Sequence, residues 1–388
     1  MVLSHFLDLS GAPYVLIDLV RHMVGAGLGE HLTFFTYPPA DRGNLKRVVA
    51  LGLKPKVLAN PCLAPPLAQG DVVLLNTVGF HRDVLEEVLL ATERGVVKAL
   101  VWYIHEDDPE RLFTPSETKR VRRLIQRGRL TMVVLARGAH ERFRRHFGVD
   151  ILREPYRFDL PAEHHLVRGP ADFDELRFIL PGSVGDGRKG QLVVLYALAA
   201  FYGKYYKDDP ALYRDFNLTF VGLEESFLTQ QIERHRGIHG DRLRCVGKVD
   251  RAGSLRLIRE ANVTICYSLR ECLPLFVFEG MLAGHPILRN ECSGVDEQLE
   301  DGRNGFLVRG DDFWHLVERF EQILNRRKTS NEQLAAMSRR SHDMALARRE
   351  HGYDGIIGVV KGAFFDSDAA PRTLAVNVAD STSERRAG

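Results

Sequence analysis

The segment from Val263 to Gly284 constrains the fold most strongly, because it contains a strand, a polar loop and a helix in that order. Val263–Tyr267 is an apolar run typical of a buried strand, and Leu275–Leu282 is predicted to form a helix that stops at Gly284. Pro274 suits the first turn of that helix, where a missing N–H costs nothing. Strand, loop and helix in this order are the repeating unit of a parallel, doubly wound sheet.

Two glutamates flank the start of this helix. Glu271 lies in the loop and Glu279 lies on the helix, with seven residues between them. A helix N-terminus carries unpaired N–H groups and the positive end of the dipole, so it suits phosphate, and neighbouring carboxylates can accept hydrogen bonds from sugar hydroxyls. The pattern predicts a phosphosugar or nucleotide-sugar site. A glycosidase pair is disfavoured, since two such glutamates would point apart unless the substrate is elongated. Two plain surface glutamates remain the other alternative.

Glu271-x7-Glu279, followed by Gly-Met-Leu-Ala-Gly-His-Pro-Ile and then Cys-Ser-Gly-Val-Asp-Glu, resembles the family-4 (group 1) retaining glycosyltransferases of GT-B fold. The resemblance extends more weakly over most of the chain. It implies two Rossmann-like doubly wound domains facing a central cleft, and transfer with retention of the anomeric configuration. It also implies that Glu271 contacts the donor hexose and Glu279 the ribose. The family often has Gly-Phe-Gly after the first glutamate, whereas Pro274 here lacks an N–H.

A second phosphate-binding loop is predicted at 181–190, which reads Pro-Gly-Ser-Val-Gly-Asp-Gly-Arg-Lys-Gly before a helix. A Walker A motif is rejected, because Gly190 stands where Ser or Thr should hold magnesium. The segment resembles the transferase "G-R…K-G" loop, which implies that Lys189 binds the donor diphosphate. Ser183 occupies the usual Arg position, so Arg188 is the substitute. The first N–H groups of the helix at Leu275 are expected to add to this site.

In the first half of the chain, three groups of candidate site residues lie at or just after the carboxyl ends of predicted strands. Gly11 lies in a glycine loop after the first strand, Asn76-Thr77 ends another strand, and Val97–Ile104 leads into His105. Ligands of open α/β sheets bind at the carboxyl ends of strands. The resemblance implies that Gly11 lies near the phosphates, that His105 in "W-x-I-H-E" holds the donor sugar, and that Asn76 and Thr77 lie near the acceptor. A plain turn and a structural histidine are the alternatives.

A chain of 388 residues is too long for one ordinary core. We predict an N-terminal acceptor domain at 1–165 and a nucleotide-sugar domain at 166–347, with a Pro- and His-containing linker around 160–175. A helix at 348–366 is expected to cross back to the first domain, as in GT-B enzymes. The tail 367–388 has few apolar residues and is expected to be disordered.

Composition excludes several classes of protein. The net charge of +2 argues against a nucleic-acid-binding polycation, and no apolar run of about 18 residues indicates a membrane span. The N-terminus lacks a basic and apolar leader, so no signal peptide is expected. The cysteines show no C-x-x-C pair and no metal spacing, so we expect no metal centre, no disulfide framework and a reducing cytoplasm. They are Cys62, Cys245, Cys266, Cys272 and Cys292.

Two basic helices within 117–146 provide a further feature. The first opens at the capping box Thr114-Pro-Ser-Glu117, and Lys and Arg then recur through Arg145. A solvated face is one interpretation. Peripheral contact with anionic lipid on the inner face of a membrane is the other.

The leading hypothesis is a metal-independent hexosyltransferase that needs no cofactor, because Lys and Arg suffice to neutralise the diphosphate. It would use a nucleoside diphosphate sugar and a glycan or lipid-linked acceptor, with cell-surface polysaccharide as the family-level expectation. The alternatives are a GT-B phosphorylase-like enzyme and a catalytically weak nucleotide-sugar-binding scaffold.

Overall fold

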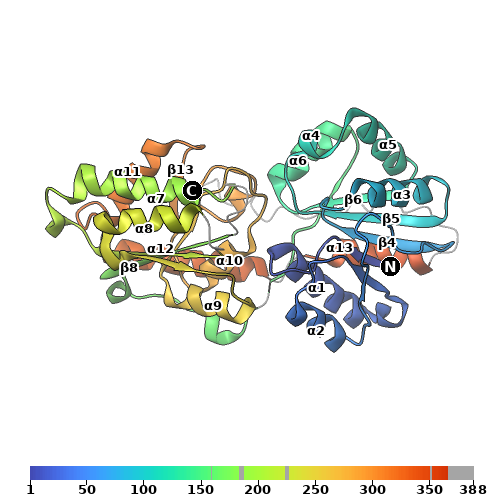
Figure 1. The fold of residues 1–388 in the computed structure, drawn as a ribbon, viewed down its shortest axis with the longest axis horizontal. Coiled ribbons are helices and arrows are strands. Elements are labelled where there is room, and N and C mark those ends of the chain that lie inside the picture. The colour runs from blue at the N-terminus through green and yellow to red at the C-terminus, as the bar shows by residue number, and fades with distance from the viewer. Residues whose placement is uncertain (159, 183–187, 223–226, 350–351, 366–388) are drawn as a thin grey trace, which may run out of the picture.

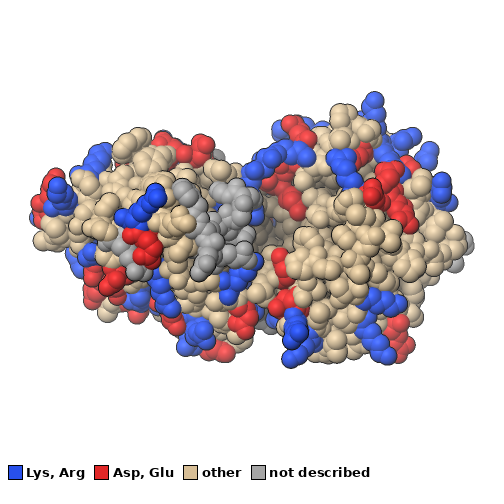
Figure 2. Space-filling view, in the orientation of Figure 1, with Lys and Arg blue, Asp and Glu red and all other residues tan. Residues whose placement is uncertain are grey.

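The computed structural model describes residues 1–158, 160–182, 188–222, 227–349 and 352–365. Within them the chain forms two α/β lobes joined at a narrower waist (Figures 1 and 2). Each lobe is built on one sheet, and every strand pairing within the two sheets is parallel. The predicted fold class, two doubly wound domains, is confirmed.

The first sheet has the strand order β3-β2-β1-β4-β5-β6-β7. Its strands are β1 (Val2–Ser4), β2 (Phe34–Thr36), β3 (Lys56–Val57), β4 (Asp71–Asn76), β5 (Val97–Ile104), β6 (Leu130–Val134) and β7 (Leu152–Arg153). The helices of this lobe are α1 (Gly11–Met23), α2 (Arg42–Ala50), α3 (Arg82–Glu93), α4 (Pro109–Leu112), α5 (Pro115–Gln126) and α6 (Arg137–Phe147). The order reverses at β1 and β4, which places their following loops at a topological switch point.

The second sheet has the order β10-β9-β8-β11-β12-β13, so its reversal lies at β8 and β11. Its strands are β8 (Glu175–Pro181), β9 (Asp215–Val221), β10 (Leu243–Val246), β11 (Val263–Cys266), β12 (Ile287–Asn290) and β13 (Gly305–Val308). The remaining helices are α7 (Gln191–Phe201), α8 (Phe227–His239), α9 (Arg251–Glu260), α10 (Leu275–Leu282), α11 (Phe313–Leu324), α12 (Asn331–Arg349) and α13 (Asp354–Phe365). The central strands β1, β4, β5 and β11 are largely buried on both faces, as parallel strands between helices must be.

Local differences from the sequence expectations have simple causes. Gly11 is the first residue of α1, not a loop residue, because the helix begins directly after the extended Ser10. Pro274 caps α10 instead of entering it, since its backbone is extended at φ −65° and ψ 123°. β2 is preceded by a 3-10 turn at Gly29–His31, and a second 3-10 turn follows β12 at Val295–Glu297.

The last helix packs against the first lobe. α13 contacts β4 and β5, and the hydroxyl of Tyr353, just before it, donates to the carbonyl oxygen of Val15 at 3.1 Å. α12 contacts α10 of the second lobe. The chain therefore returns from the second lobe to the first, while the domain boundaries stay predictions. The tail 367–388 lies outside the described residues.

No helix among the described residues is both long and apolar enough to cross a bilayer. Helix α5 begins with the expected capping box of Thr114 and Glu117. One of its basic residues forms ion pairs within the first lobe: Arg120 pairs with Glu86 at 2.6 Å and with Glu93 at 2.9 Å. Others are exposed over α5 and α6, where Figure 2 shows basic side chains mixed with acidic ones. The exposed basic residues are Lys119 and Arg123 on α5, Arg127 and Arg129 just after it, and Arg137, Arg142, Arg144 and Arg145 on α6.

Candidate active site between the two domains

The loops that follow β8 and β11 meet at the carboxyl edge of the second sheet. The Leu269 N–H donates to the carbonyl oxygen of Arg188 at 2.8 Å, and the Arg188 guanidinium donates to the carbonyl oxygen of Arg270 at 3.0 Å. Both loops start at the reversal of strand order, so the topology brings them together. Two sequence-predicted segments, far apart in the chain, thus form one site.

Glu271 binds both predicted phosphate-binding cations. Its carboxylate pairs with Lys189 Nζ through one oxygen, and with Arg188 Nη1 at 2.9 Å through the other. Burial opposes ionisation, but the charges of Lys189 and Arg188 outweigh it and hold the pKa of Glu271 below its ordinary value. Lys189 Nζ also lies 5.9 Å from the ring centroid of Phe276 in the first turn of α10. The two cations and the carboxylate therefore lie together beside the N-terminus of α10. Ser183 lies outside the described residues.

Buried polar residues fix the loop from behind. Asn290 exchanges hydrogen bonds with the backbone of Ser268, at 3.0 and 2.9 Å. Arg289 is fully buried and donates to the Ser293 carbonyl at 2.7 Å and to Gln298. The positive charge of Arg289 adds to that around Glu271. Sequence reasoning missed Arg289, because an Arg at a strand end is usually read as exposed.

The start of α10 is held from both lobes. Gln298 donates to the Pro274 carbonyl at 2.9 Å, and the Tyr156 hydroxyl donates to the Leu273 carbonyl at 2.7 Å. Gly280 lets this helix lie against β11, since a Cβ there would come within 2.2 Å of Thr264 Oγ1. Leu275, the first residue of α10, is thus positioned by its neighbours on both sides.

Glu279 lies deeper, with only 1% of its side chain exposed, and pairs with Arg251 at the start of α9. The Arg251 guanidinium lies 5.2 Å from the ring centroid of Tyr14 on α1, and Arg47 lies at the same distance from that ring. The predicted ribose carboxylate is therefore linked through one arginine to the first lobe. Sequence reasoning missed Arg251, which no spacing relates to Glu279.

His105 extends from the end of β5. Its Nε2 lies 2.9 Å from Asn76 Oδ1, and Asn76 donates its amide to the Ala12 carbonyl at 3.5 Å. Burial, with the nearby His5, lowers the pKa of His105 to about 3, so the ring is neutral at ordinary pH. Asn76 thus accepts a hydrogen bond from the Nε2–H of the ring.

The two predicted acceptor residues are buried in the first lobe. Thr77 has φ +70°, and its Oγ1 lies 3.2 Å from His5 Nδ1. The Thr77 carbonyl accepts from Trp102 Nε1 at 2.7 Å. The hydroxyl of Thr77 and the amide of Asn76 therefore position neighbouring groups, and direct contact with an acceptor stays a prediction. A Cβ on Gly11 would meet nothing within 4 Å, so no protein contact requires glycine there.

Glu106, directly after His105, is a further titratable group at this edge. Burial raises its pKa to about 7, although the backbone N–H groups of Glu106, His105 and Val78 oppose the rise. Arg188 of the second lobe also lowers the pKa of Glu106 through its charge, which shows that the two lobes approach each other here. Nothing in the residue pattern distinguished Glu106 from an exposed glutamate.

A cavity of about 480 Å³ opens between the lobes next to Leu269. Its walls include Asp107 and Arg142 of the first lobe, which pair at 2.8 Å. From the second lobe come Glu291, Ser293 and Asp296. Both lobes contribute polar residues to the cavity wall. Leu269, which also lines the cavity, lies two residues before Glu271 in the same loop.

Two facing doubly wound domains with a polar interdomain site define the GT-B class. Residues 176–326 match the model of the family described as Glycosyl transferases group 1, in agreement with the predicted resemblance. The chain is 37% identical over 70 residues to EpsD of Bacillus subtilis (strain 168), and 27% identical over 183 residues to the trehalose synthase of Pyrococcus horikoshii. These matches cover 18% and 47% of this chain and only 18% and 41% of those relatives.

Solved structures resemble the chain over nearly its whole length. Anabaena HepE in complex with UDP and glucose superposes with a TM-score of 0.66 at 16% identity, covering 92% of this chain and 97% of that one. A glycosyltransferase from Rickettsia africae gives 0.67 at 13% identity, covering 94% and 98%. At these identities the likeness establishes the fold.

Proposed function

We propose that the chain is a retaining glycosyltransferase that moves a hexose from a nucleoside diphosphate sugar to a glycan or lipid-linked acceptor. The carrying observation is that Lys189 and Arg188 converge on Glu271 beside the start of α10. This arrangement offers two cations and helix N–H groups to a diphosphate, and a carboxylate to sugar hydroxyls.

Donor binding replaces the ion pairs that Glu271 forms with Lys189 and Arg188. The diphosphate takes Lys189 and Arg188, and Glu271, released from both, accepts hydrogen bonds from hexose hydroxyls. As the glycosidic bond breaks, the same cations stabilise the negative charge on the departing diphosphate. This neutralisation is the basis for proposing a reaction that needs no metal and no cofactor.

The remaining residues have roles in the same proposal. Glu279 accepts hydrogen bonds from the two ribose hydroxyls, and neutral His105 contacts the hexose. Retention of configuration follows a same-face displacement in which the leaving phosphate removes the acceptor proton. The polar cavity beside Leu269 suits an acceptor rich in hydroxyl groups.

The setting proposed for this reaction is cell-surface polysaccharide synthesis in the cytoplasm, at the inner face of the membrane. The exposed basic residues of α5 and α6 support contact with anionic headgroups, each basic residue contributing about 1 kcal/mol near such a surface.

Thermal unfolding with UDP, GDP and ADP in turn tests the donor site. We begin with UDP because HepE was solved with UDP. One nucleotide at a hundred times its dissociation constant should stabilise the protein by about 2.7 kcal/mol, and Glu279→Ala should abolish this gain. Stabilisation by inorganic phosphate alone would favour a phosphorylase-like enzyme.

Turnover then separates an enzyme from a scaffold. Consumption of a nucleotide sugar, lost in Glu271→Ala, is the expected result, and NMR of the product's anomeric proton reports the stereochemistry. Nucleotide binding without any turnover would refute the enzyme and leave the scaffold alternative.

A further inference from the structure

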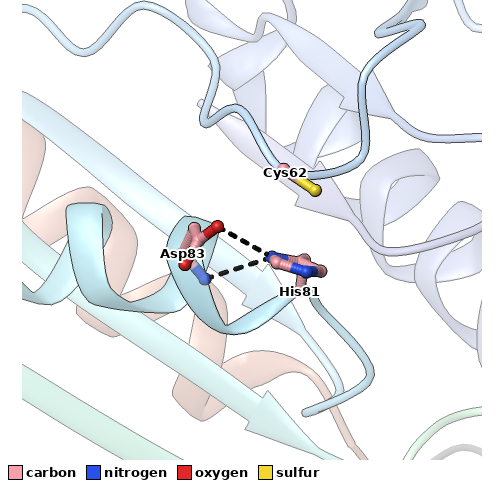
Figure 3. Close-up of side chains that lie close together, drawn as sticks. All are labelled: Cys62, His81 and Asp83. Atoms are coloured by element: carbon pink, nitrogen blue, oxygen red, sulfur yellow. Dashed lines mark hydrogen bonds and ion pairs between the residues drawn. The ribbon is translucent and has the colours of Figure 1, made fainter.

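Three side chains that the donor site does not use gather on the first lobe. Cys62 comes from the loop between β3 and β4, and His81 and Asp83 come from the start of α3 (Figure 3). We propose that they form a binding site for a transition-metal ion of the zinc type. This inference does not rest on the proposed glycosyl transfer, because it concerns a separate place and a separate ligand.

The ligand atoms are close enough for one ion. Cys62 Sγ, a His81 ring nitrogen and an Asp83 carboxylate oxygen all lie within 4.8 Å of one another, and His81 Nδ1 is 3.3 Å from Asp83 Oδ2. Tetrahedral zinc with bonds of about 2.0–2.3 Å places its ligands roughly 3.3–3.7 Å apart. The imidazole and carboxylate already meet this spacing, and small side-chain rotations bring in the thiolate.

The two segments are held in place without an ion. The Cys62 N–H donates to Asn60 Oδ1 at 2.9 Å, and the next carbonyl, that of Leu63, accepts from the Tyr37 hydroxyl at 2.7 Å. On the other side, His81 is the N-cap residue of α3, and its Nδ1 accepts from the Asp83 N–H at 3.3 Å, a hydrogen bond that an ion on Nδ1 would replace. A site built on fixed backbone needs little reorganisation to bind.

Charge also favours a cation. The positive charge of the neighbouring Arg82 is paired with Glu117 at 3.0 Å. The positive end of the α3 dipole opposes a bound cation, but a thiolate and a carboxylate together neutralise a divalent ion. The Cys62 thiol gives up its proton on binding, so affinity rises with pH.

Ligand type selects the metal. One sulfur, one imidazole nitrogen and one carboxylate oxygen suit zinc or cobalt, whereas magnesium and calcium prefer oxygen ligands alone. Three protein ligands leave a fourth position for water or a small anion. Because α3 follows the Asn76-Thr77 end of β4, a bound ion would fasten the Cys62 loop to α3 on the proposed acceptor side.

Titration of the full chain with cobalt(II) tests the site, with a phosphine reductant present to keep the thiols reduced. We expect one equivalent to bind, with a thiolate-to-cobalt charge-transfer band in the near ultraviolet. Cys62→Ser should remove this band, and His81→Ala should weaken binding by about a hundredfold or more. Cys245→Ser, the matched control on β10, should bind like the wild type.

Competition against a chromogenic chelator gives the zinc affinity of the same variants. Asp83→Asn should reduce it by about tenfold or more. His81 and Asp83 are exposed and Cys62 is half-buried, so the variants are expected to fold, which circular dichroism checks. Absence of the charge-transfer band in the wild type, or zinc binding that survives Cys62→Ser unchanged, would overturn the proposal.

Discussion

The ion pair of Arg251 and Glu279 offers a sharp test of how the site is built. Glu279 is 1% exposed and Arg251 21% exposed, so the arginine is the group that compensates a buried charge. Removing one partner of a buried pair costs about 3–5 kcal/mol. Because water reaches part of Arg251, we expect the lower end, about 3 kcal/mol, for Arg251→Ala. This corresponds to a fall in Tm of about 6–12 °C for a domain of this size.

A double-mutant cycle isolates the pair. Arg251→Ala combined with Glu279→Ala removes the unpaired carboxylate, so the two effects should be non-additive by about 1–3 kcal/mol. Arg256→Ala is the control, since Arg256 is exposed on the same helix. Urea unfolding of the wild type, the two single variants, the double variant and the control gives the free energies. If Arg251→Ala matches Arg256→Ala within about 0.5 kcal/mol, the pair does not contribute as argued.

Nucleotide binding tests the function of the same pair. If ribose replaces Arg251 on Glu279, then Arg251→Ala removes a competitor, and UDP should stabilise the variant more than the wild type. The contact of Arg251 with Tyr14 would also break on binding, which would loosen the two lobes from each other. A smaller stabilisation of the variant would mean instead that Arg251 itself binds the nucleotide.

Three further outcomes are expected. The pKa of Glu106, raised to about 7 from an ordinary 4.5, means that the folded state keeps a proton that the unfolded state has lost. Stability should therefore fall as pH rises from about 4.5 to 7, by up to about 3 kcal/mol, and denaturant midpoints of Glu106→Gln should lack this fall. Gly190 has φ +63°, and an added Cβ would lie 2.1 Å from the Tyr267 carbonyl oxygen. Gly190→Ala should lower the unfolding free energy by more than about 2 kcal/mol, whereas Gly237→Ala, in α8 with nothing within 4 Å of its Cβ, should not. Vesicles of anionic lipid should sediment the protein at low salt, and reversing the charges of exposed residues on α5 and α6 should abolish this; equal binding to neutral vesicles would contradict it.

Much of the fold was predictable, because it depends on local patterns. The apolar run of β5 and the capped start of α5 lie where the residues indicate, since burial and capping act within a few neighbours. The pattern at 263–284 likewise indicated β11 and α10, with Glu271 in the loop and Glu279 on the helix. The short edge strand β3 was missed, because two exposed residues carry no periodic signal.

Sequence by itself determined the parallel α/β architecture and the chemical types that line the cleft, because strand and helix periodicity and helix starts are local properties. Only the tertiary structure decided which side chains of the site lie next to one another. Glu271 with Lys189, Glu279 with Arg251 and Cys62 with His81 each join distant segments, and their meeting depends on strand order and on how the lobes and loops pack. A buried charge is stabilised by whichever opposite charge the fold brings near, and spacing along the chain does not record that distance.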